Sequence, residues 1–90
     1  MKDKGRLLKN GYANMSQANI PLKEFINSYR DSLGIEGAEM LIKQVLNRAG
    51  LSDHTEFTKE EALKVCRELK QHPGFIGIIG GILNSRIIIR

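Results

Sequence analysis

The sequence predicts an all-α fold, a compact domain like a four-helix bundle. Apolar side chains recur at helical spacing in four segments, a glycine or proline stands between successive segments, and the connections are short. Ninety residues suffice for one domain with a small margin of stability. We expect a flexible basic arm over residues 1–18, one helical domain over residues 19–90 and a short extended tail at Ile87–Ile89. No internal repeat is visible.

The first helix is expected to begin near Asn19, a residue that caps helices well, with Pro21 in the first turn. Gly34 is the expected end, because glycine readily takes the positive φ found beyond a helix. The apolar stripe of this helix is Leu22, Phe25, Ile26, Tyr29 and Leu33.

The second helix is expected over Glu36–Ala49, with acidic residues in its first turn and a basic residue in its last. Gly50 then fits a glycine C-cap, and Leu51 can contact Leu46. The apolar face is wide: Ala38, Leu41, Ile42, Val45, Leu46 and Ala49.

The third helix has the clearest start. Thr58 and Glu61 form a capping box, and Phe57 before the cap can pack on Ala62. His72-Pro73-Gly74 ends the helix, because the residue before a proline avoids helical dihedrals. The inward side chains are Ala62, Val65, Cys66 and Leu69.

The fourth helix is expected over residues 74–85, where Phe75, Ile78, Ile79, Ile82 and Leu83 follow helical spacing. A β-hairpin turning at Gly80-Gly81 is the alternative. Gly77 and Gly81 lie four residues apart, so they would share a side suited to close helix packing. The packing partner is either the helix at 36–49 or the same helix of a second chain.

Motifs for catalysis or cofactor binding do not rise above chance, so we expect no enzyme, cofactor or small-molecule substrate. His54 and His72 lack partners at zinc-ligand spacing. Cys66 lies on an apolar helix face without a nearby base, as an inert buried thiol does. A single cysteine excludes an internal disulfide framework and favours a reducing, cytoplasmic location.

The loop between the second and third helices is a candidate calcium site, because acidic residues cluster between two helices there. If Glu61 took the last position of an EF-hand loop, the first, third and fifth would be Gly50, Ser52 and His54. Those positions need oxygen ligands, and the sixth needs a glycine where Thr55 stands. We therefore expect no metal site. The longest apolar stretch, residues 75–83, is also too short to span a membrane.

The end of the chain is unusually apolar for a small domain. A single domain of this size cannot easily cover both faces of the fourth helix and three terminal isoleucines. We therefore expect a protein-interaction or regulatory module that self-associates, most simply as a homodimer. The expected interaction residues are Phe75, Ile76, Gly77, Gly80, Ile87, Ile88 and Ile89.

The alternative is a nucleic-acid-binding regulator. Residues 1–11 hold four basic side chains and one acid, within a net charge of +4 for the whole chain. Such an arm could contact phosphates. The residues concerned are Lys2, Lys4, Arg6 and Lys9. A helix-turn-helix reader is less favoured, because the fourth helix offers only Asn84, Ser85 and Arg86 to base edges, at the wrong end.

Overall fold

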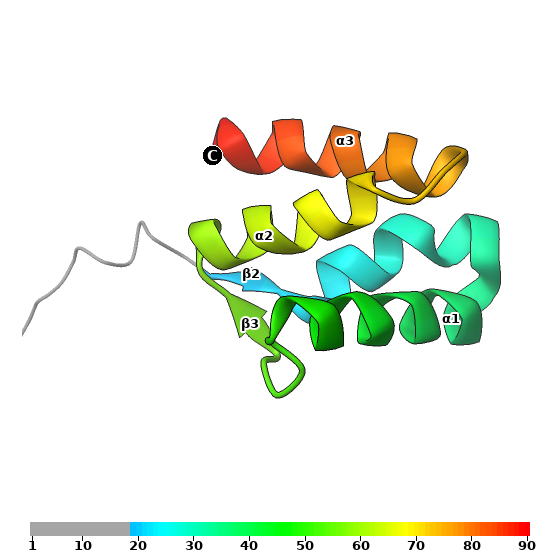
Figure 1. Ribbon diagram of the computed structural model, residues 1–90, viewed down its shortest axis with the longest axis horizontal. Helices are drawn as coiled ribbons and strands as arrows, with labels where there is room; N and C mark the ends of the chain where they lie inside the picture. Colours follow the sequence, from blue (N-terminus) through cyan, green and yellow to red (C-terminus); the bar gives the residue numbers. More distant parts are fainter. Residues whose placement is uncertain (1–18) are drawn as a thin grey trace, which may run out of the picture.

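A computed structural model describes residues 19–90, and most of these residues are helical (Figure 1). The order is β2 (Ile20–Pro21), α1 (Leu22–Ala49), β3 (Glu56–Phe57), α2 (Lys59–Lys70) and α3 (Phe75–Ile88). Three helices and a two-stranded sheet thus stand, within residues 19–90, where four helices were predicted. The first two predicted helices are the two parts of α1. The predicted basic arm, residues 1–18, lies outside the described residues.

The bend in α1 occurs at Gly34. This residue has φ 76° and ψ 166°, a conformation that is essentially restricted to glycine. The chain therefore folds back, and residues 22–33 and 35–49 form the two arms seen in Figure 1. The interruption predicted at this glycine is confirmed.

The start of α1 differs from the prediction. Pro21, in extended conformation, is the N-cap, because residues 20 and 21 pair with β3 before the helix begins. The side-chain amide of Asn19 instead donates to a carboxylate oxygen of Glu56, at 3.2 Å. Asn19 therefore contacts the neighbouring strand rather than capping the helix.

Two other helix ends follow the prediction. Gly50 has φ 76° and ψ 25°, and the N–H of Leu51 donates to the carbonyl of Leu46 at 2.8 Å. The capping box is also present: the N–H of Glu61 donates to the hydroxyl of Thr58, and the carboxylate of Glu61 accepts from the N–H of Thr58.

Residues 75–88 form one continuous helix, which excludes the hairpin at Gly80-Gly81 and corrects the extended tail. The physical reason lies in Ile87. It follows Gly80 and Leu83 by helical spacing, and its side chain is fully buried only if the helix continues. Helix formation as far as Ile88 therefore buries apolar surface that an extended tail would leave in water.

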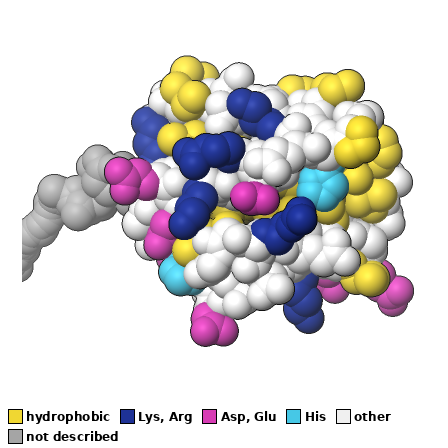
Figure 2. Space-filling model, viewed as in Figure 1, with side chains coloured by type: hydrophobic (Ala, Val, Ile, Leu, Met, Phe, Trp, Pro, Cys, Tyr) yellow, Lys and Arg dark blue, Asp and Glu magenta, His cyan; other side chains and the backbone are white. Residues whose placement is uncertain are grey.

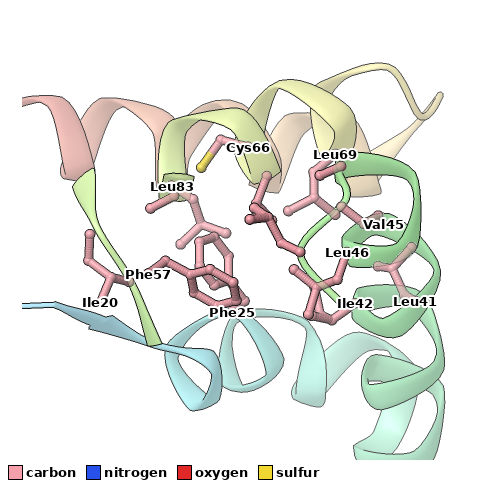
Figure 3. Packing of buried hydrophobic residues seen from close by; sticks show 14 of the residues in the cluster. Ile20, Phe25, Leu41, Ile42, Val45, Leu46, Phe57, Cys66, Leu69 and Leu83 are labelled. Atoms are coloured by element: carbon pink, nitrogen blue, oxygen red, sulfur yellow. The ribbon is translucent and has the colours of Figure 1, made fainter. Parts of the chain in front are cut away.

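The core is enclosed by the two arms of α1, by the two-stranded sheet and by the helices α2 and α3 (Figure 3). Phe25 and Phe57 are fully buried and meet edge to face, with ring centroids 5.6 Å apart and planes at 84°. Aliphatic side chains from α1, α2 and α3 surround this pair.

The two halves of the domain repeat one arrangement: a short strand, a helix, a turn with a positive-φ glycine, and a second helix. Ile20 and Phe57 occupy the same place in the order of each half, and they pair antiparallel. The turn glycines correspond as well, with φ 76° at Gly34 and φ 68° at Gly74. In this repeat, residues 35–49 are the counterpart of α3.

Candidate interaction surface

The inner face of α3 packs against α2 more closely than ordinary side chains permit. A Cβ added at Gly80 would lie 2.9 Å from the Cβ of Leu69, and one added at Gly77 would collide with the carbonyl oxygen of His72. Leu83 and Ile87 continue this face and are buried. Figure 3 shows Leu83 reaching the core cluster beside Cys66. Two glycines thus set the distance between α2 and α3.

Contacts near both ends of α3 tie it to the first arm of α1. The hydroxyl of Tyr29, a fully buried residue, donates to the carbonyl of Ile76 at 2.7 Å. Burial, and secondarily the Cys66 thiol, raise the pKa of the Tyr29 phenol, so the phenol stays protonated. The guanidinium of Arg90 pairs with the carboxylate of Glu24. The inner face of α3 is therefore fixed in place.

The outer face of α3 and its C-cap carry a row of exposed apolar side chains, which we call the outer stripe: Phe75, Ile78, Ile82 and the C-cap residue Ile89. Their exposed fractions are 45%, 66%, 50% and 83%. The intervals of three, four and seven residues place them along one side of the helix, as in the seam of a coiled coil. Ile88 is also 52% exposed. Figure 2 shows hydrophobic side chains at the two ends of the upper edge, with basic side chains and uncoloured atoms between them.

Charge is nearly absent from α3. Arg86 is its only charged residue, and it has no acidic residue. The corresponding residues of α1 differ, because their exposed side chains include Glu36, Glu39, Lys43 and Arg48. The outer stripe therefore combines apolar surface with little electrostatic preference.

Gly81 has a different setting from the other glycines of α3. A Cβ added there would meet nothing within 4 Å. Glycine in a helix costs about 1 kcal/mol relative to alanine. Packing within the chain explains Gly77 and Gly80, but it does not explain Gly81. The predicted close-packing pair was Gly77 with Gly81, whereas the structure pairs Gly77 with Gly80, against α2 rather than residues 36–49.

The structure separates the predicted interaction residues into two groups. Gly80 and Ile87 are buried, and Gly77 faces the backbone at His72, so these three pack inside the chain. Ile76 is partly buried against the core. The residues that are exposed are Phe75, Ile88 and Ile89.

Sequence reasoning left Ile78 and Ile82 out of the predicted surface. Both belong to the five-residue apolar stripe predicted for this helix, and the sequence alone does not tell whether that stripe faces inward or outward. The two glycines that adjoin α2 could have decided this, since they mark the side of closest packing and Ile78 and Ile82 lie elsewhere on the helix.

Two other reactive side chains, those of Cys66 and His54, are engaged in local structure. Cys66 is fully buried, and this burial raises the pKa of its thiol to about 11, so the thiol is protonated near neutral pH. Nε2 of His54 lies 3.4 Å from Oε2 of Glu61, and its ring stacks on Phe57. In the loop tested for calcium, Glu61 thus serves the start of α2.

Within residues 19–90, no group of three or more His, Cys, Asp and Glu side chains could hold a metal ion. No helix in this same part of the chain has the length and apolar character needed to cross a membrane. The proposed phosphate-contacting residues Lys2, Lys4, Arg6 and Lys9 lie outside the described residues.

Comparison with models of protein families, with curated proteins and with solved structures gave no match.

Proposed function

We propose that this protein is an interaction module that associates with a second copy of itself through the outer stripe of α3. The observation that carries the proposal is the row of exposed Phe75, Ile78, Ile82 and Ile89 on a helix whose inner face is already packed. Exposed apolar surface of this regularity is typical of a protein contact.

A second copy suits this stripe for a physical reason. In a two-fold dimer the same patch meets itself, so a patch of one charge sign would repel its copy. The outer stripe avoids that conflict because its four members are uncharged, and its heptad-like spacing matches that of an identical helix. An apolar helix face is therefore complementary to itself.

The interface is expected to be small. A helix of 14 residues is about 21 Å long. One helix pair of that length buries less than the roughly 1,200–2,000 Å² of a standard interface. We therefore expect a dissociation constant in the range of about micromolar rather than nanomolar.

Sedimentation equilibrium of the full chain, over concentrations from about 1 to 300 µM, tests this proposal. Wild type should pass from monomer to dimer across this range. Ile82→Glu should remain monomeric, because dimerization would bring two carboxylates into an apolar contact. Circular dichroism at the lowest concentration should show that this variant remains folded.

Met40→Glu is the matched control. Met40 is 63% exposed on the counterpart of α3, so the variant makes the same apolar-to-acidic change away from the outer stripe. It should dimerize like wild type. A wild-type chain that is monomeric at the highest concentration contradicts the proposal, and so does equal dimerization of wild type and Ile82→Glu.

A further inference from the structure

We propose that the two copies of α3 cross antiparallel at Gly81. This inference rests on the dimer proposed above and adds the orientation and the point of closest approach. Gly81 lies between Ile78 and Ile82 in sequence, and the space above it is open in the single chain. An unfilled glycine beside an apolar stripe lets another backbone come near, as Gly77 and Gly80 do for α2.

The charges of the last turn favour the antiparallel orientation. A parallel pair would place Arg86 of one copy beside Arg86 of the other. With no acid in α3, this repulsion would have no compensation within the helix. An antiparallel pair separates the arginines to opposite ends and aligns the helix dipoles favourably.

The antiparallel orientation also fixes which side chains meet. Where two antiparallel helices pack, each layer of the interface joins one stripe position of the first copy to the neighbouring stripe position of the second copy. Ile78 of each copy then packs on Ile82 of the other, giving two adjacent isoleucine layers with Gly81 beside them. Phe75 lies opposite Ser85 of the second copy, whose small side chain leaves room for the ring.

Gly81→Ala tests the crossing point because two measurements should move in opposite directions. Within one chain the added methyl group meets nothing within 4 Å, so the folding equilibrium constant should rise about fivefold through helix propensity. Between copies it should hold the helices apart and weaken dimerization about tenfold. Urea unfolding at low concentration and sedimentation equilibrium measure the two effects.

Gly80→Ala is the matched control, because its methyl group would press on Leu69 within the same chain. It should lower the folding equilibrium constant instead of raising it. If Gly81→Ala dimerizes as tightly as wild type, the crossing at Gly81 is overturned, although the dimer itself stands. A wild-type chain without dimer removes both proposals, so the two failures are distinguishable.

Disulfide trapping tests the orientation. Cys66 is fully buried, so a new surface cysteine is the reactive thiol of each variant. A mixture of Phe75→Cys chains and size-tagged Ser85→Cys chains should give mainly the mixed disulfide under mild oxidation. Mainly Phe75→Cys and Ser85→Cys homodimers would overturn the antiparallel orientation. So would disulfide formation no greater than that of the exposed control Gln44→Cys.

Discussion

The second arm of α1, residues 35–49, and α3 occupy corresponding places in the two halves of the domain, yet they use their faces oppositely. Residues 35–49 bury large side chains and expose mostly charged or polar ones. Helix α3 exposes large side chains, and Gly80 is among the three residues that it buries. The buried sets are Ala38, Leu41, Ile42, Val45, Leu46 and Ala49 in one helix and Gly80, Leu83 and Ile87 in the other.

This contrast indicates that a helix of this domain can be held in place without an apolar outer face. The counterpart helix carries Glu39, Lys43 and Arg48 on its exposed side and is still held by its inner face. The isoleucines on the outer face of α3 therefore add little to the packing of one chain. The difference between the two helices supports an external partner for α3.

The largest expected effect on stability distinguishes the buried face of α3 from its exposed face, at the neighbouring residues Ile87 and Ile88. Ile87 is fully buried and Ile88 is 52% exposed. Ile87→Ala should lower the free energy of unfolding by about 3 kcal/mol, because it leaves a cavity in the core. Ile88→Ala should change it by less than about 0.5 kcal/mol. Urea unfolding at a concentration where the chain is monomeric measures both.

Equal losses in these two variants would contradict the division of α3 into an inner and an outer face. Removal of residues 87–90 would not make this distinction, because it deletes the buried Ile87 together with the exposed end of the helix.

The next effect concerns the turns that the two halves share. Gly34 has φ 76° and ψ 166°, and Gly74 has φ 68° and ψ −149°, so both lie in a region that other residues enter only with strain. Gly34→Ala and Gly74→Ala should each cost about 2 kcal/mol of stability. The open space around both positions means that backbone strain, not a clash, is the cause.

Gly50→Asn is the control for these two variants. Gly50 has φ 76° and ψ 25°, the left-handed helical region that asparagine tolerates, so this change should cost only a few tenths of a kcal/mol. If Gly34→Ala is as stable as wild type, the bend of α1 does not depend on the glycine conformation. A loss of stability in only one of the two alanine variants would mean that the turns at Gly34 and Gly74 do not correspond.

Local signals in the sequence predicted the helices well. The capping box at Thr58, the glycine after Ala49 and the stop at Gly34 depend on a few neighbouring residues, and each is present in the structure. The sheet was missed because each strand has two residues, too few to show an alternating pattern.

Features that depend on distant contacts were not predictable. The repeat is invisible in the sequence because corresponding core positions carry different side chains, such as Phe25 and Ala62 or Tyr29 and Cys66. The two faces of α3 could not be told apart because both carry isoleucine, and only the packing against α2 decides between them. The hydrophobic pattern predicted the helix, but not the direction it faces.

The smallest effect concerns one of the hydrogen bonds between the two halves, the one that Tyr29 makes. Tyr29 of the first half donates its hydroxyl proton to the carbonyl of Ile76 in the first turn of α3. Tyr29→Phe keeps the ring and removes this bond, so it should lower stability by about 1 kcal/mol at neutral pH. Urea unfolding of both proteins, from neutral pH to pH 11, measures the difference.

The pH dependence follows from the direction of the Tyr29 pKa, which burial raises in the folded chain. The folded state then holds the phenol proton at a pH where the unfolded chain begins to release it, near about pH 10. Stability contributed by Tyr29 is present below that pH and declines above it. The advantage of wild type over Tyr29→Phe should therefore shrink as pH rises past 10. An advantage that stays constant to pH 11 would mean that the phenol is no harder to ionise in the folded chain, and that the contact between the two halves is open to water.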